Sequence, residues 1–189
     1  YFLRQHKKTE QFISEINSQS MYYKQQIAEV MFNLLDSHDT ERILTTANGN
    51  IQHVKAALTF LFLQRGTPCI YYGTELALKG GPDPDCRRVM PWDRVFEDND
   101  ILNFMKQLIK VRKEAASIIQ HGTYKLEEVK PDILSLKWSY EGKEVQAIFN
   151  QSSENFVLER DSVDLASLCQ FEDGQQVILP DGFVIAVSK

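Results

Sequence analysis

The chain has 189 residues, of which 43% are hydrophobic and 25% charged, so its composition is that of an ordinary globular protein with one large domain or somewhat more. A net charge of −5 excludes the basic footprint of a nucleic-acid-binding protein, and no apolar run approaches the ~18 residues of a membrane-spanning helix. Three widely separated cysteines without metal-ligand spacing indicate a reducing compartment, so we expect a cytoplasmic protein with no metal or other cofactor.

The first half of the chain predicts two helices around an apolar strand. Thr9 is expected to cap a helix whose apolar positions recur up to Ile16. The apolar run Met31–Leu35 is typical of a buried strand. A turn signal at Asn48–Asn50 comes next, and Asn50 is expected to cap a second amphipathic helix, which Gly66 ends.

A second strand and a third helix follow. The short apolar run Cys69–Tyr72 predicts a strand buried on both faces, as parallel strands are. Asp98 or Asn99 is expected to cap a helix with an apolar face that reaches Ala115. The alternation of helix and strand predicts a parallel sheet with right-handed crossovers. Because two strands cannot form a stable parallel sheet alone, we expect further strands before Tyr1 or from another chain.

Between the second strand and the third helix lies a long segment, Gly80–Asp93, whose prolines and glycines exclude regular structure. Loops of this length in compact domains are functional or disordered, and the paired arginines and an aromatic residue here favour order. We expect Trp92 to be a packing anchor, with a stacking surface for sugar as the alternative.

The pattern changes near residue 120. Apolar and polar residues alternate in three runs that contain Trp138, Phe149 and Phe183, which predicts an antiparallel β domain. Turns are expected at Glu141–Gly142, Asp173–Gly174 and Asp181–Gly182. Residues 1–119 hold 15 basic and 14 acidic side chains, whereas residues 120–189 hold 6 and 12. We therefore predict an α/β part at 1–119 followed by an all-β domain at 120–189.

The polar residues Asp36, His38 and Asp39 directly follow the first predicted strand. A strand that ends in ionisable groups is typical of the carboxyl-terminal mouth of an α/β barrel, where those groups point into the site. A second interpretation is that these residues only form an ordinary polar turn. A third is that they are metal ligands. The sequence alone leaves these interpretations open.

The chain resembles the α-amylase superfamily of glycoside hydrolases, most closely its cyclomaltodextrinase, neopullulanase and maltogenic amylase branch. Four stretches carry the resemblance: Phe32–Thr40 (FNLLDSHDT), Gly66–Glu75 (GTPCIYYGTE), Gly80–Asp93 and the β-rich tail. The resemblance implies the last two strands and helices of a (β/α)8 barrel followed by a β-sandwich. It also implies that the catalytic nucleophile and general acid lie upstream of the residues in this chain.

The resemblance assigns roles to five residues of this chain. Asp39 matches the carboxylate that stabilises the transition state, and His38 matches a histidine that binds hydroxyls of the same sugar ring. Asp83 and Arg87 match a pair that binds sugars on the non-reducing side of the cut, although an internal ion pair that only fixes the loop is the alternative. Arg42 is expected to belong to the substrate-binding residues by bracing the site near Asp39, and a solvated arginine is the alternative.

The implied activity is retaining hydrolysis of α-1,4, or α-1,6, glucosidic bonds in maltodextrins, cyclodextrins or pullulan. The expected partner is an α-glucan oligosaccharide, with no nucleic acid and no membrane, and a homodimer is left open. With neither nucleophile nor acid, this chain alone is expected to be inactive. The alternative is a non-catalytic carbohydrate-binding or scaffold protein with amylase-like architecture.

Overall fold

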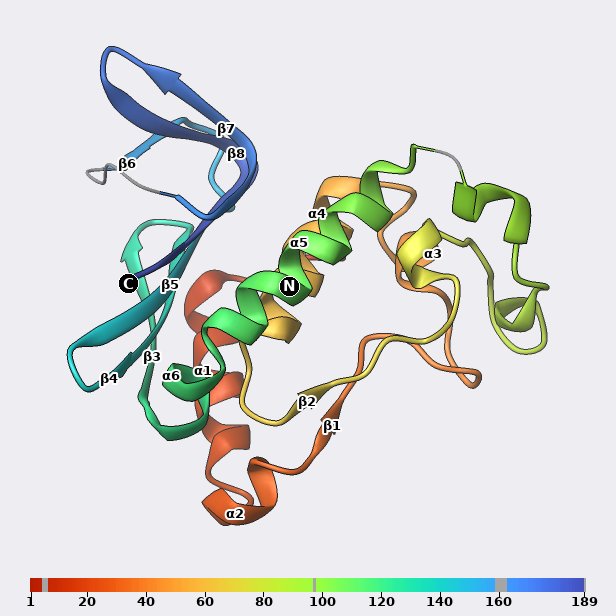
Figure 1. Ribbon diagram of the computed structural model, residues 1–189, viewed down its shortest axis with the longest axis horizontal. Helices are drawn as coiled ribbons and strands as arrows, with labels where there is room; N and C mark the ends of the chain where they lie inside the picture. Colours follow the sequence, from red (N-terminus) through yellow and green to blue (C-terminus); the bar gives the residue numbers. More distant parts are fainter. Residues whose placement is uncertain (5–6, 97, 159–162, 189) are drawn as a thin grey trace.

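The computed structural model describes residues 1–4, 7–96, 98–158 and 163–188 (Figure 1). Its α-helices are α1 (Thr9–Ser20), α2 (Gln25–Ala28), α3 (Ile43–Thr46), α4 (Ile51–Phe62), α5 (Asp100–Glu114) and α6 (Ala116–His121). Single 3₁₀ turns are η1 (Thr74–Leu76), η2 (Asp85–Arg87) and η3 (Trp92–Phe96). Figure 1 shows α4 and α5 in the middle, with an antiparallel sheet on one side and, on the other, the loops that follow β1 (Phe32–Asn33) and β2 (Thr67–Pro68). No helix in the described part of the chain is long and apolar enough to cross a membrane.

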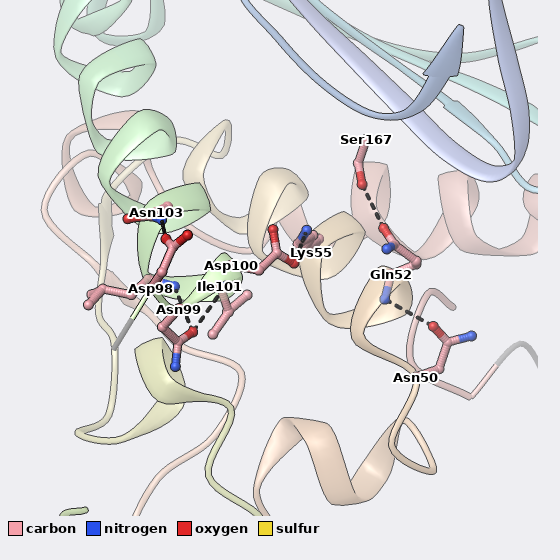
Figure 2. A network of polar contacts seen from close by, with 10 residues as sticks. Asn50, Gln52, Lys55, Asp98, Asn99, Asp100, Ile101, Asn103 and Ser167 are labelled. Carbon is pink, nitrogen blue, oxygen red and sulfur yellow. Dashed lines mark hydrogen bonds and ion pairs between the residues drawn. The ribbon is translucent and has the colours of Figure 1, made fainter. Parts of the chain in front are cut away.

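Two of the predicted helix caps are confirmed. The side chain of Asn50 accepts hydrogen bonds from the backbone N–H groups of residues 52 and 53, and Asn99 does the same for residues 101 and 102 (Figure 2). Next to the second cap, Lys55 of α4 contacts Asp100 at 2.7 Å, which ties the start of α5 to α4.

The prediction that Thr9 caps α1 is wrong. Lys8 occupies the cap position and makes no side-chain cap bond. The Thr9 hydroxyl instead donates to Asp132 at 2.9 Å and lies 2.9 Å from the Tyr1 hydroxyl. The contact between the buried Thr9 hydroxyl and the Asp132 carboxylate therefore replaces the local cap.

Two parallel strands, β1 (Phe32–Asn33) and β2 (Thr67–Pro68), pair with each other. The strand β1 is shorter than the predicted Met31–Leu35, and β2 lies just before the predicted run Cys69–Tyr72 and not within it. The side chains of Phe32 and Leu34 are 72% and 49% exposed, so the prediction of a buried strand is wrong for this structure. The run Cys69–Tyr72 follows β2 outside the paired strand, and Cys69 is exposed. A strand is buried only when other elements cover its faces, and within the described residues β1 pairs with β2 alone.

The predicted antiparallel β domain is confirmed. Its strands are β3 (Thr123–Lys130), β4 (Ile133–Tyr140), β5 (Lys143–Asn150), β6 (Phe156–Leu158), β7 (Leu165–Glu172) and β8 (Gln175–Val187). They pair in the order β3-β4-β5-β8-β6, and β7 also pairs with β8. The turns at Glu141–Gly142 and Asp173–Gly174 both have two consecutive positive φ angles, which is the geometry that two-residue hairpins require.

The third predicted turn, at Asp181–Gly182, is wrong, because these residues lie inside β8. Asp181 has a φ of 61°, and a Cβ atom on Gly182 would lie 2.5 Å from the carbonyl oxygen of Leu168. They bend β8 rather than reverse it. The first half of β8 pairs with β6, its second half pairs with β5, and β7 follows it along both halves. The sheet is therefore curled around one long strand.

One cluster of buried apolar side chains runs through both parts of the chain. The rings of Phe2 and Phe60 lie 5.5 Å apart, and Phe149 of the sheet lies 4.9 Å from Phe2 and 6.3 Å from Phe60. Trp138 of β4 is 1% exposed and donates from Nε1 to the carbonyl oxygen of Leu63 at 2.8 Å. The helices α4 and α5 and the sheet thus share one core, which holds the loops after β1 and β2 on a rigid support.

Candidate functional site

The residues after β1 form a tight turn that presents His38 and Asp39 to solvent. The Ser37 N–H donates to the Thr40 hydroxyl oxygen at 2.9 Å, and the Asp39 N–H donates to the Ser37 hydroxyl oxygen at 3.1 Å. These bonds hold the backbone of the turn, since hydroxyl side chains stabilise turns in this way. The side chains of His38 and Asp39 are 62% and 73% exposed, and His38 Nε2 lies 3.2 Å from Asp39 Oδ2. The two predicted residues therefore lie side by side and face outward.

Asp36, at the start of this turn, has a different environment. It is 4% exposed and accepts hydrogen bonds from the Thr74 hydroxyl at 2.9 and 3.1 Å and from the Ile43 N–H at 3.2 Å. Burial raises the pKa of Asp36, while these bonds and the nearby Arg42 guanidinium act in the opposite direction. Its carboxylate is thus occupied within the protein, and no group of three His, Cys, Asp or Glu residues able to hold a metal occurs among the residues that the structure describes.

Arg42 is completely buried, which rules out the solvated alternative. Its Nε donates to the carbonyl oxygen of Cys86 at 2.6 Å, and its Nη1 donates to the carbonyl oxygen of Tyr72. The guanidinium carbon lies 4.1 and 4.6 Å from the ring centres of Tyr71 and Tyr72, in cation–π geometry. This is the bracing position that the sequence suggested, and it leaves no exposed surface of the arginine for a sugar.

The Gly80–Arg88 loop packs directly against the turn that carries Asp39. The Arg42 N–H donates to the Gly80 carbonyl oxygen at 3.0 Å, and the Cys86 thiol donates to the His38 carbonyl oxygen at 3.0 Å. A Cβ atom on Gly80 would lie 2.6 Å from the carbonyl oxygen of Asp85 and 3.2 Å from Arg42 Cγ. Only glycine therefore allows this close approach.

Two acid–arginine pairs are interleaved in this loop, and about half of each side chain is exposed in both. Asp83 and Arg87 contact each other, with about half of each side chain exposed. Arg88 makes two bonds of 2.8 Å to Asp85, whose carboxylate also accepts from the Gly81 N–H at 2.7 Å. These donors lower the pKa of Asp85. The pairs differ in that Asp85 also bonds the loop backbone at Gly81, which lets the Asp85–Arg88 pair staple the loop.

Sequence reasoning missed three features of the site. Asp36 bonds Thr74, which lies 38 positions along the chain, and Cys86 bonds His38, which lies 48 positions before it. No local sequence pattern predicts contacts over such separations. Trp92 is 67% exposed, so the prediction that it is a packing anchor is wrong. Trp92 begins η3, shortly after the Asp83–Arg87 pair, and its exposed ring is available as a flat apolar surface. For the Asp85–Arg88 ion pair, the sequence offered one signal, the closely spaced acids and arginines of Asp83–Arg88.

The chain matches the family model described as alpha amylase, catalytic domain, over residues 3–95. It is 39% identical over 155 residues to an intracellular maltogenic amylase of Bacillus subtilis (strain 168), which covers 81% of this chain and 26% of that protein. The chain belongs to the α-amylase family. A cyclomaltodextrinase of a Bacillus species is 45% identical over 125 residues, or 66% of this chain and 22% of that protein.

The likeness extends to solved structures of the α-amylase family. A cyclomaltodextrinase structure superposes on the whole of this chain with a TM-score of 0.81 and 32% identity, and the match covers 34% of that protein. The chain thus spans about a quarter of the length of the curated relatives it matches. The antiparallel sheet is consistent with the carboxyl-terminal β domain expected from the resemblance.

Proposed function

We propose that these residues form part of a retaining α-glucan hydrolase of the cyclomaltodextrinase or maltogenic amylase type. The observation that carries the proposal is the pair His38 and Asp39, exposed and 3.2 Å apart on a turn fixed by hydroxyl bonds. The relatives named cyclomaltodextrinase and maltogenic amylase support the substrate class.

In this proposal Asp39 is the transition-state-stabilising carboxylate. Glycoside hydrolysis passes through a state with positive charge on the sugar ring, and a fixed anion strengthens its hydrogen bonds to the ring hydroxyls as that charge develops. His38 can donate to a hydroxyl of the same ring. The attacking carboxylate and the general acid, two groups that retaining enzymes require, are assigned by the resemblance to a part of the enzyme outside this chain.

Asp83 and Arg87 would bind the neighbouring sugar. A carboxylate accepts and a guanidinium donates, so the pair can hold two adjacent hydroxyl groups at once. Their half-exposed side chains suit this role. The packing of the Gly80–Arg88 loop on the Asp39 turn would place both sugar contacts along one cleft.

We further propose that β1 and β2 are the last two strands of a (β/α)8 barrel. They are parallel and adjacent, and the polar turn of His38 and Asp39 follows the carboxyl end of β1. In barrels of this kind the active site lies at the carboxyl ends of the strands.

The decisive experiment is Asp39→Asn in the full-length protein that carries this chain, assayed on β-cyclodextrin and maltoheptaose. We expect kcat to fall about 10²-fold or more, because a preorganised electrostatic contact is lost, while the dissociation constant for maltoheptaose changes little. The control is Asp173→Asn at the exposed β7–β8 turn, where asparagine tolerates the positive φ.

Near-normal turnover by Asp39→Asn would contradict the assignment of that carboxylate. A wild-type protein that binds maltoheptaose but hydrolyses neither substrate would favour the non-catalytic carbohydrate-binding alternative.

A further inference from the structure

A buried hydroxyl–carboxylate contact joins the ends of the two parallel strands. Thr74, which is 3% exposed, begins η1 a few residues after β2. Its hydroxyl lies within hydrogen-bond distance of both carboxylate oxygens of Asp36, at 3.1 and 2.9 Å. The contact spans 38 positions in the sequence and is made away from solvent.

We propose that Thr74 and Asp36 are positioning residues for Asp39, holding its turn in the orientation that the sugar ring requires. This inference rests on the proposed function. It concerns two residues that touch no sugar themselves, and it assigns them an effect on turnover rather than on folding alone.

The placement of the turn depends on few contacts. The bonds among Ser37, Asp39 and Thr40 are internal, so they fix the shape of the turn and not its direction. Among the described residues, its direction is set on one side by Asp36 and on the other by the Cys86 thiol, which bonds the His38 carbonyl oxygen. Because β1 has only two residues, strand pairing adds little to hold the turn in place.

An ionised carboxylate suits this position better than an amide would. The Asp36 side chain receives the Thr74 hydroxyl and the Ile43 N–H, which are both donors, and a carboxylate is an acceptor only. The neighbouring Arg42 guanidinium offsets part of the cost of burying the charge.

The test uses two substitutions at Thr74 and a matched control in the full-length protein. Thr74→Val removes the hydroxyl and keeps the shape of the side chain, while Thr74→Ser keeps the hydroxyl. The control is Thr59→Val in α4, because Thr59 is also fully buried but its hydroxyl has no partner among the described residues. Each variant is measured for kcat and KM on β-cyclodextrin and for hydrogen–deuterium exchange of the amides of residues 37–40.

We expect Thr74→Val to lower kcat about 10- to 100-fold with KM within about twofold, since misplacing a catalytic group by an ångström costs up to about 10² in rate. Exchange at residues 37–40 should become faster, and Thr74→Ser should restore both readouts. Thr59→Val should match the wild type. Equal effects of Thr74→Val and Thr59→Val, or no rescue by Thr74→Ser, would overturn the proposal.

The two proposals can fail separately. If the wild-type protein hydrolyses no α-glucan, the proposed function falls, and unchanged exchange at residues 37–40 in Thr74→Val then also overturns the positioning role. If Thr74→Val does not fold, Thr74→Ala takes its place with the same readouts, and normal kcat in that variant contradicts the proposal.

Discussion

Arg42 Nε donates to the carbonyl oxygen of Cys86 at 2.6 Å, and this buried bond is one of those that connect the two loops of the site. One loop carries Asp39, and the other carries Asp83 and Arg87. The same guanidinium bonds the carbonyl oxygen of Tyr72 after β2, so three separate segments meet at one buried side chain. Such a centre makes the relative position of the loops depend on one residue.

Replacement of this arginine should be costly. Arg42→Met keeps much of the apolar volume but removes the donors, which leaves the buried Cys86 carbonyl and the partly buried Tyr72 carbonyl without this partner. We expect the free energy of unfolding to fall by about 2–5 kcal/mol, and Arg42→Lys to recover little of it because an ammonium group cannot reproduce the planar fork. Urea unfolding followed by circular dichroism measures this.

The control for this prediction is Arg4→Met, because Arg4 is 61% exposed and lies 3.9 Å from its partner Glu41. It should change stability by less than about 0.5 kcal/mol, as exposed substitutions do. A similar loss of stability in Arg42→Met and Arg4→Met would refute the bracing role.

Replacing the two arginines of the Gly80–Arg88 loop should have different effects on KM. Arg87→Ala removes a half-exposed donor that we assign to sugar binding, so KM for maltoheptaose should rise about 10-fold or more with a smaller change in kcat. Arg88→Ala removes an equally exposed donor whose partner Asp85 is tied to the loop backbone at Gly81 and has no assigned sugar contact, so its KM should change less. Steady-state kinetics on the two variants decides the matter, and a larger rise of KM for Arg88→Ala would reverse the assignment.

The pKa of Asp85 should be lower than that of an ordinary aspartate. The two bonds from Arg88 and the Gly81 N–H favour its charged form and lower its pKa. Because the folded-state pKa is the lower one, the contribution of this carboxylate to loop stability is present above about pH 4, the ordinary aspartate value, and is lost as the pH falls through the folded-state pKa. Carboxyl-carbon NMR titration measures the pKa directly. In Arg88→Ala it should move up towards the ordinary value, and an unchanged pKa would show that the pair does not form in solution.

The two tryptophans provide a matched pair for the contact between α4 and the sheet. Trp138→Phe removes the bond to the Leu63 carbonyl oxygen and leaves a cavity in the core, so we expect a loss of roughly 2–4 kcal/mol in the free energy of unfolding. Trp92→Phe should cost less than about 0.5 kcal/mol because Trp92 is 67% exposed. Denaturant unfolding of both variants tests the difference, and equal values would contradict the shared core.

Local signals in the sequence predicted the features that depend on neighbouring residues. The caps at Asn50 and Asn99 and the hairpin turns at Glu141 and Asp173 are correct because their chemistry lies within four residues. The prediction failed where a distant partner intervened. The Thr9 hydroxyl bonds Asp132, which lies 123 positions away, and so does not cap its helix. The residues Asp181–Gly182 have the sequence pattern of a turn but form a bend inside β8.

The same reasoning explains the site. The polar cluster at His38 and Asp39 was visible because the residues are adjacent and end an apolar run. The role of Asp36 was not visible, since Thr74 is far along the chain and its hydroxyl carries no motif of its own. The burial of Arg42 depends on Tyr71, Tyr72 and Cys86 closing around it, which only the folded chain shows.

The shared core also bears on how such enzymes can be recombined. A crossover near residue 120 would leave Phe149 and Trp138 facing a foreign helix in place of Phe60 and Leu63. The carboxyl-terminal sheet is thus not an interchangeable accessory, and chimaeras of related amylases should retain activity only when α4 and this sheet are inherited from the same parent.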